Sequence, residues 1–108
     1  MGQQPGPGIT LAGAAMTELK WTSKALSDLT RLYDFLAPAN RTAAAKTVQA
    51  LVNGPQILLT HPRVGERLDE FDPREVRRIL VGRYEMRYEL GGQVAYILRI
   101  WHTREERW

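Results

Sequence analysis

The chain has 108 residues, of which 44% are hydrophobic and 25% charged, and its formal net charge is +3. This balance predicts one globular domain in which a single helix layer packs on a single sheet, and it argues against an intrinsically disordered chain. There is no cysteine, which excludes disulfides, a cysteine nucleophile and thiolate metal sites. The two histidines, His61 and His102, are too far apart in the sequence to predict a zinc or iron site, and we expect no cofactor.

The first fifteen residues, MGQQPGPGITLAGAA, differ from the rest of the chain. They are uncharged, rich in Gly and Pro, and show neither helical nor strand periodicity. A secretory signal peptide would need a basic start and a longer apolar stretch, and no apolar run reaches the roughly 18 residues of a membrane span. We interpret residues 1–15 as a disordered tail, an expression remnant or a start codon placed too early, and we expect the folded domain to occupy 16–108.

The patterned sequence begins with a short strand and a helix. Residues 17–22 alternate, with Leu19 and Trp21 on one face, which is typical of a strand. Ser23 is suited to cap a helix N-terminus, and leucines then recur at helical spacing until Pro38 ends the helix.

A second helix follows directly. Asn40 is a suitable N-cap, and the apolar stripe of this helix includes Leu51. The sequence Asn-Gly-Pro at 53–55 breaks or kinks the helix. We expect a further helical turn at 57–59, which His61 and Pro62 bring to an end.

After Pro62 the period changes from helical to alternating. We expect a polar loop at 63–73, strands at 75–81, 84–90 and 93–102, and tight turns at 82–83 and 91–92. The last strand is apolar on both faces, which predicts a central place in the sheet. The order β-α-α-β-β-β predicts an α+β fold, with two helices on one face of a small, mostly antiparallel sheet and the first strand at an edge.

Helices on one face leave the other face of the sheet open, and a cationic surface is expected there. The residues expected to line it are Arg78, Arg87 and Arg99, followed by His102 and Arg104 past the end of the last strand. Arg83 is near in sequence, but the pattern does not fix where it points. The aromatic neighbours are Tyr84, Tyr88, Tyr96 and Trp101. Such a surface suits phosphates, stacked bases or an acidic peptide.

Two of these arginines have an ordinary structural alternative. Arg87 and Glu85 alternate along one strand and could form a solvated face with cross-strand ion pairs. Arg99 lies in an apolar strand and needs a partner there. Asp69 or Glu70 of the preceding loop are the candidates for that partner.

The two histidines are the candidates for acid–base chemistry. The ordinary pKa of His102 suits proton transfer, but no serine or cysteine is placed to need it as a base. The carboxylates lie in a loop or beside arginines, and no ligand cluster predicts a metal. Metal-independent RNA cleavage by Arg, His and Tyr side chains and the absence of catalysis both stay open. His61, before a proline at a helix end, is interpreted as a cap or surface residue.

Four segments of the chain resemble a known family. They are WTSKALSDLTRLYDFL, HPRVGERLDEF, EVRRILVGRYEMRYEL and YILRIWHTREER. In this order and spacing they resemble the RelE/ParE superfamily of bacterial type II toxin–antitoxin toxins, from Leu19 to Arg107. The family has the β-α-α-β-β-β order expected above. The stretch RIWHTRE resembles the ParE-like, plasmid-stabilisation branch more than the RelE nuclease branch.

The resemblance implies one of two targets. RelE-like members cut mRNA on the ribosome without metal, using basic residues on the second to fourth strands and a tyrosine or histidine near the C-terminus. ParE-like members lack this set and poison DNA gyrase. Carried over by position, the basic pair of the second strand falls on Val76 and Arg78, and the third-strand arginine falls on Glu85. Arg104 matches the arginine after the last strand, the C-terminal tyrosine has no counterpart, and His102 is the candidate for a histidine role.

A carboxylate at Glu85 would repel a scissile phosphate, so the resemblance favours a toxin that poisons DNA gyrase by binding it. One alternative is a ribosome-dependent mRNA endonuclease with Arg78, His102 and Arg104 as catalytic candidates. Another is an inactive family member that serves as an antitoxin-binding or autoregulatory partner.

The resemblance also implies an antitoxin as the partner. An acidic, partly disordered segment of it would fold onto the cationic face and the apolar grooves beside the helices. A dimeric, DNA-binding antitoxin would give a heterotetramer or a larger complex, and the expected location is the cytoplasm. The residues expected to bind the target or the antitoxin are Arg78, Arg83, Arg87, Arg99, Trp101, His102 and Arg104.

Overall fold

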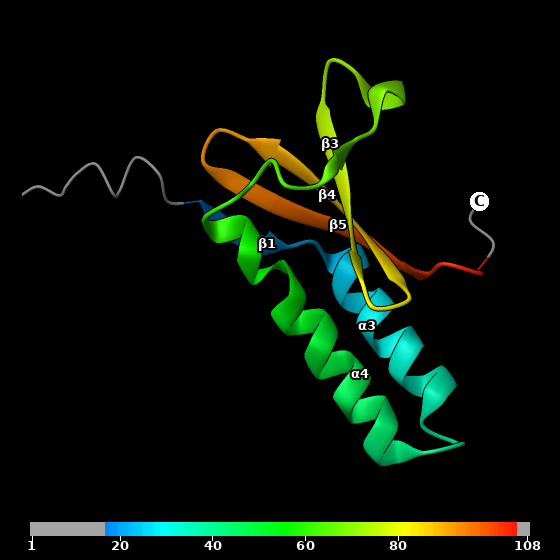
Figure 1. Ribbon diagram of the computed structural model, residues 1–108. Coiled ribbons are helices and arrows are strands. Elements are labelled where there is room, and N and C mark those ends of the chain that lie inside the picture. The colour runs from blue at the N-terminus through cyan, green and yellow to red at the C-terminus, as the bar shows by residue number, and fades with distance from the viewer. Residues whose placement is uncertain (1–16, 106–108) are drawn as a thin grey trace, which may run out of the picture.

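The computed structural model describes residues 17–105, so the expected tail at 1–15 lies outside the described residues. Figure 1 shows a helical hairpin beside a twisted sheet. The elements in chain order are β1 (Glu18–Trp21), α3 (Ser23–Leu36), α4 (Arg41–Asn53), the 3-10 helix η1 (Gly54–Leu59), β2 (Glu66–Arg67), the 3-10 helix η2 (Asp69–Phe71), β3 (Glu75–Val81), β4 (Tyr84–Gly91) and β5 (Val94–His102). Within these residues no helix is long and apolar enough to cross a membrane.

The N-cap of helix α3 lies one residue earlier than expected. Thr22, and not Ser23, is the N-cap, because its side-chain oxygen accepts a hydrogen bond from the Ala25 N–H at 3.2 Å. The same hydroxyl donates to the Ile97 carbonyl at 2.7 Å. Thr22 therefore joins the end of β1 to the start of α3 and ties both to β5, which a sequence pattern does not reveal.

Helix α4 has the cap and the end that the sequence predicts. The Asn40 side chain accepts a hydrogen bond from the Ala43 N–H at 2.9 Å. The helix stops at Asn53, and η1 continues from Gly54 with Pro55 in its first turn. A Cβ at Gly54 would lie 2.6 Å from a Val81 methyl group, so the glycine lets η1 pack closely against β3.

The strand order is β1-β5-β4-β3-β2, with β1 parallel to β5 and the other pairs antiparallel. The edge position of β1 is confirmed, and β5 lies inside the sheet between β1 and β4, next to the central strand. The loop expected at 63–73 is wrong in one respect, because Glu66 and Arg67 pair with Arg78 and Arg77 as a short fifth strand. The two-residue length of β2 explains why periodicity did not reveal it.

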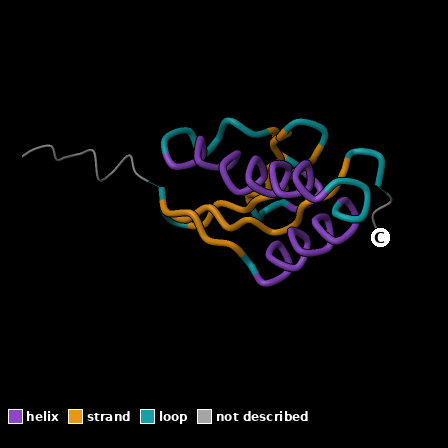
Figure 2. Tube along the Cα trace, turned by 90° about the horizontal axis from the view of Figure 1, so that it is seen from below, coloured by secondary structure: helices purple, strands orange, loops and turns teal. Residues whose placement is uncertain are grey.

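The core lies between the helical hairpin and one face of the sheet. The two helices run side by side next to the strands (Figure 2). The fully buried apolar side chains include Leu51 of α4, Leu58 of η1, Met86 and Tyr88 of β4, and Ile97 and Ile100 of β5. The α+β architecture predicted from the order of elements is confirmed.

A β-bulge in β5 decides which side chains face this core. Arg87 is opposite Arg99, whereas Tyr88 is opposite Ile97, so Leu98 is the additional residue. The shift places both Ile97 and Ile100 on the buried side, although they are three residues apart. Beyond the bulge, residues of β5 alternate again as far as His102.

Candidate functional site

Three arginines meet on the face of the sheet opposite the core, as the alternation predicts. Arg78 of β3 is opposite Arg87 of β4, which is opposite Arg99 of β5. Cross-strand partners project to the same side of a sheet. The three guanidinium groups therefore form one row across the three longest strands.

A buried carboxylate neutralises part of the charge of this row. Glu85 is only 1% exposed, and its oxygens accept hydrogen bonds from Arg78 Nη1 at 3.2 Å and Arg87 Nη2 at 3.3 Å. Arg78 also donates to Glu66 of β2 at 2.8 Å, and this hydrogen bond, followed by that to Glu85, raises the pKa of Arg78. The ion pair between Arg87 and Glu85 is confirmed, but the expected solvated face is wrong, because Glu85 is buried and Arg87 is partly buried.

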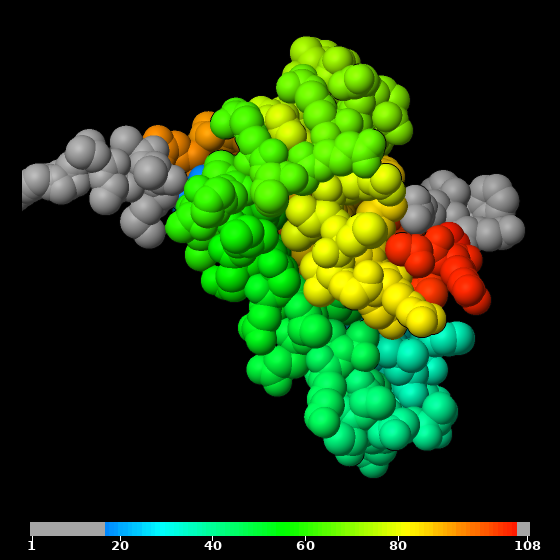
Figure 3. Space-filling view, in the orientation of Figure 1, coloured from blue at the N-terminus to red at the C-terminus, as the bar shows by residue number. Residues whose placement is uncertain are grey.

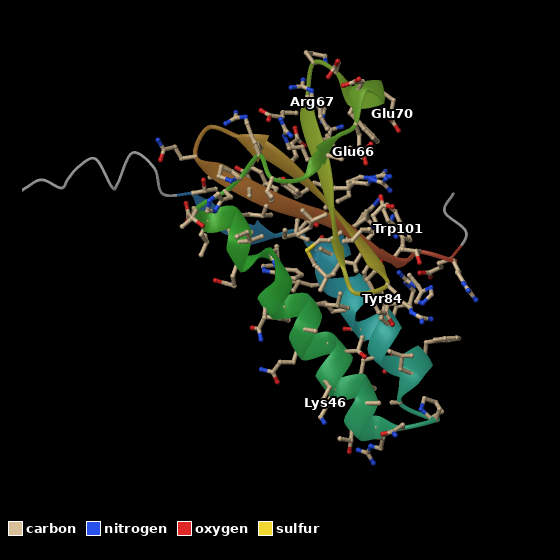
Figure 4. The ribbon with its side chains drawn as sticks, in the orientation of Figure 1. Lys46, Glu66, Arg67, Glu70, Tyr84 and Trp101 are labelled. Carbon is tan, nitrogen blue, oxygen red and sulfur yellow. The ribbon has the colours of Figure 1, made fainter. Side chains whose placement is uncertain are left out.

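Aromatic rings stack on the same row. The Arg87 guanidinium carbon lies 5.2 Å from the Phe71 ring centroid and 4.8 Å from that of Trp101, and Arg99 lies 5.0 Å from Trp101. Among the described residues, Arg87 Nε is the one buried side-chain polar atom without a hydrogen-bond partner. The sequence pattern did not identify Phe71 as part of this cluster. The one available signal was that it is a single aromatic residue inside a polar loop. Trp101, one of these rings, is labelled in Figure 4.

The partner of Arg99 is Asp28 of α3, and the expected pairing with Asp69 or Glu70 is wrong. Arg99 Nε donates to Asp28 at 2.9 Å, and the buried Ile100 N–H donates to the same carboxylate at 2.8 Å. Burial alone would raise the pKa of Asp28, but hydrogen bonds from Arg99, Ile100 and Arg31 outweigh it and lower that pKa. The hydrogen bond to Asp28 raises the pKa of Arg99.

The expected cationic face is thus an arginine–carboxylate network with little free charge. The three arginines of the row form ion pairs with Asp28, Glu66 and Glu85. A phosphate approaching this face would meet carboxylates that already hold the guanidinium groups. Bare phosphate binding by the row is therefore unfavourable.

His102 lies on the other face of the sheet, which differs from the expected position beside the arginine row. Strand β5 continues through His102, so alternation places Trp101 opposite Glu85 and His102 opposite Tyr84. The Tyr84 and His102 rings meet edge to face, with centroids 5.2 Å apart. Tyr88 is fully buried on this core side as well, so it does not neighbour the arginine row.

Two hollows flank the Tyr84–His102 pair. One, of about 520 Å³, lies towards α3 and includes Leu32 and Phe35 in its lining. The other, of about 250 Å³, lies towards α4 and includes Leu51. Tyr84 and His102 line both hollows.

Arg83 and Arg104 lie at the rims of these hollows and not in the arginine row. Both are exposed, and within residues 17–105 neither has a carboxylate within salt-bridge distance. His61 is exposed and contacts the Thr60 hydroxyl at 2.9 Å, which agrees with its interpretation as a surface residue. The candidate residues therefore divide between two places on the molecule.

Comparisons with known proteins agree with the fold. The chain matches the family described as ParE toxin of type II toxin-antitoxin system, parDE, over residues 19–107. It is 31% identical over 88 residues to Toxin RelE2 of Caulobacter vibrioides, covering 82% of this chain and 97% of that protein. A solved structure described as the chromosomal ParDE TA system from P. aeruginosa matches with a TM-score of 0.67 and 29% identity, over 80% of this chain and 95% of the other. The chain therefore belongs to the ParE toxin family, within the RelE/ParE superfamily of type II toxin–antitoxin toxins.

Proposed function

We propose that this toxin inhibits growth by binding and poisoning DNA gyrase, and that it does not cleave mRNA. The observation that carries the proposal is the Glu85 carboxylate, buried between Arg78 and Arg87. A nuclease of the superfamily is expected to have an arginine at this position. A carboxylate there opposes the developing negative charge of phosphoryl transfer.

The hydrogen bonding of His102 supports the same proposal. Its Nδ1 accepts a hydrogen bond from the Arg104 N–H at 3.1 Å. In the neutral ring the proton is then on Nε2, so the lone pair that a general base needs is already engaged. Burial raises the pKa of Tyr84, the neighbouring phenol, which disfavours it as a base at neutral pH.

The partner under this proposal is an antitoxin whose acidic segment folds on the toxin. The similar P. aeruginosa structure is described as a ParDE system. Arg83 and Arg104, which have no carboxylate within salt-bridge distance in residues 17–105, suit acidic side chains. A dimeric antitoxin would give a heterotetramer or a larger complex in the cytoplasm.

A ribosome-dependent mRNA endonuclease is the second candidate function. The observation in its favour is the identity to a relative whose name is Toxin RelE2. Its catalytic candidates, however, are separated: Arg78 lies in the row across the sheet, while His102 and Arg104 lie at the other face and its rim. A single scissile phosphate would therefore have to contact residues on both faces of the sheet at once.

The deciding experiment compares the two targets with the same purified toxin. Incubated with gyrase, plasmid DNA and ATP, it is expected to give trapped gyrase–DNA cleavage complexes. Incubated with ribosomes carrying a defined mRNA, it is expected to leave the mRNA intact. Cleavage of mRNA in the ribosomal A site with normal gyrase activity would overturn the proposal. Harmless expression without antitoxin, together with inactivity in both assays, would indicate the inactive family member.

A further inference from the structure

The second half of β3 is an open edge of the sheet. Strand β2 pairs only with Arg77 and Arg78, so the segment 79–81 has β4 on one side and no strand of residues 17–105 on the other. Natural proteins usually protect such an edge with a charged residue, a proline, a bulge or a covering segment. The sequence of this segment is Ile-Leu-Val. It therefore carries neither charge nor proline, and its edge can accept another strand.

The backbone of Leu80 faces this open edge. The Leu68 N–H donates to the Val76 carbonyl at 2.8 Å, so the backbone polar groups of Val76 point towards β2. In an antiparallel strand these groups point to the same side at every second residue. The N–H and the C=O of Leu80, four residues after Val76, therefore point to the side of β2, beyond the end of that strand. Leu80 offers one donor and one acceptor to a strand that arrives from outside.

Exposed apolar side chains surround the same edge. Leu80 is 62% exposed, Val64 58% and Ile57 44%, and all three line one hollow of about 530 Å³. Figure 3 shows the end of β3, in yellow, next to the green segment that follows α4 on the visible face of the molecule. Apolar side chains grouped beside an unpaired strand are typical of a surface that another chain covers.

The two ends of the open edge carry opposite charges. Arg83, in the turn after β3, is exposed and has no carboxylate within 4.0 Å in residues 17–105. Glu66, the first residue of β2, has a side chain that is 63% exposed. Glu66 is opposite Arg78 at one end of the edge, whereas Arg83 follows Val81 at the other end. An antiparallel copy of this edge would therefore bring each charge near its opposite.

We propose that the open edge of β3 pairs with the same edge of a second copy of this chain, in an antiparallel arrangement with Leu80 opposite Leu80. A two-fold axis then relates two hydrogen bonds, in which each Leu80 N–H donates to the Leu80 carbonyl of the other copy. Glu66 occupies the place opposite Arg78, so the pairing is limited to residues 79–81, and Arg83 of each copy lies beside Glu66 of the other. A second copy fits this edge because the backbone groups, the apolar side chains and the charges all complement themselves under one two-fold axis.

The expected dimer is weak and reversible. Three paired residues per chain, with the apolar side chains beside them, should bury less than the roughly 1,200 Å² at which standard interfaces begin. The dissociation constant is therefore expected to be on the order of 10–100 µM. Such a dimer would close an edge that otherwise favours aggregation. It is independent of whether the toxin acts on gyrase or on the ribosome.

A single introduced cysteine tests the register, because the chain has no cysteine of its own. In a hydrogen-bonded antiparallel pair the opposite Cα atoms lie about 5.5 Å apart, which is within the range of a disulfide. Leu80→Cys, oxidised mildly in the purified full-length chain, should give a covalent dimer on a non-reducing gel. Leu26→Cys on α3 is the matched control, since Leu26 is 51% exposed. It is expected to give roughly tenfold less dimer, because nothing pairs its Cα with its own copy.

Sedimentation equilibrium measures the same association without a covalent bond. Leu80→Lys is expected to raise the dissociation constant of the wild-type dimer at least roughly tenfold, because a lysine on an edge strand opposes pairing. Arg83→Glu, which would put a carboxylate beside Glu66 of the other copy, is expected to raise it roughly threefold or more. Leu26→Lys is the control and should dimerise like the wild type. The three replaced side chains are exposed, so thermal melting should show folded variants.

The contrary outcomes are distinct. A wild-type chain that stays monomeric at about 500 µM, well above the expected dissociation constant, overturns the proposal. Equal cross-linking of Leu80→Cys and Leu26→Cys, or a dimer that Leu80→Lys leaves intact, overturns the β3 edge as its site. If the wild type is monomeric and Leu80→Lys loses gyrase inhibition or antitoxin binding, the edge serves that partner and the dimer is likewise excluded. None of these results bears on gyrase poisoning, which has its own assay.

Discussion

The Asp28 carboxylate of α3 accepts a hydrogen bond from the Ile100 N–H of β5 at 2.8 Å, so a helix side chain takes the place of a missing strand. Strand β1 pairs with β5 only as far as Ile97. Beyond that point the backbone edge of β5 would be unpaired. Arg31 completes the arrangement by donating to the Ile100 carbonyl at 3.0 Å.

Replacing Asp28 should therefore destabilise the fold. Asp28→Ala leaves a buried N–H and the Arg99 guanidinium without their acceptor, and we expect a loss of about 2–4 kcal/mol in the free energy of unfolding. The measurement is urea denaturation followed by circular dichroism. Asp34→Ala on the same helix is the control, since Asp34 is exposed; similar losses in both variants would contradict this role of Asp28.

The stability should also depend on pH through Asp28. Its pKa is lower in the folded chain than the ordinary value of 3.8, so its contribution is complete above the unfolded pKa and disappears as the pH falls through the folded pKa. Below about pH 4 the wild type should therefore lose stability more steeply than Asp28→Asn. Urea denaturation from pH 7 to pH 3 tests this, and parallel curves would exclude the effect.

The buried position of Glu85 gives a third prediction. Glu85→Gln removes the charge that Arg78 and Arg87 share, and we expect a loss of about 1–3 kcal/mol that salt barely changes. Glu89→Gln is the matched control on the same strand. Glu89 pairs with Arg74, whose side chain is 54% exposed, so its loss should be smaller and should shrink in high salt. Equal losses would show that burial of Glu85 is unimportant.

The Tyr88 hydroxyl should matter for the loop that precedes β2. It donates to the Pro62 carbonyl at 2.7 Å and accepts from the Gly65 N–H at 3.0 Å. Tyr88→Phe leaves both groups without this partner, and we expect a loss of about 1–3 kcal/mol in a thermal or urea unfolding experiment. Tyr96→Phe, at a ring that is 36% exposed, should be near neutral. A neutral Tyr88→Phe would mean that the loop finds other partners.

Local pattern was sufficient for most of the secondary structure. Strand β3 has the predicted bounds, and the ends of β4 and β5 differ from prediction by one residue. Alternation in single strands and helical spacing in α3 and α4 are properties of neighbouring residues, so a sequence contains them directly. Pairing in β2 depends on a partner strand and was missed for that reason.

The candidate site was only partly predictable. Alternation placed Arg78, Arg87 and Arg99 on one face, and the structure brings them together. It did not reveal that Asp28, over 70 positions earlier, holds Arg99. An ion pair between a helix and a strand depends on how the layers pack, and a sequence pattern within either element carries no record of it.

The sequence by itself determined the family and the order of the elements, and the family resemblance led to the proposal that Glu85 takes the place of a nuclease arginine. Only the tertiary structure decided that Glu85 is buried between two arginines, and that His102 lies on the opposite face from Trp101. The reason is physical: charge neutralisation and side-chain direction depend on cross-strand register. That register follows from the bulge at Leu98 and from the packing of the helices.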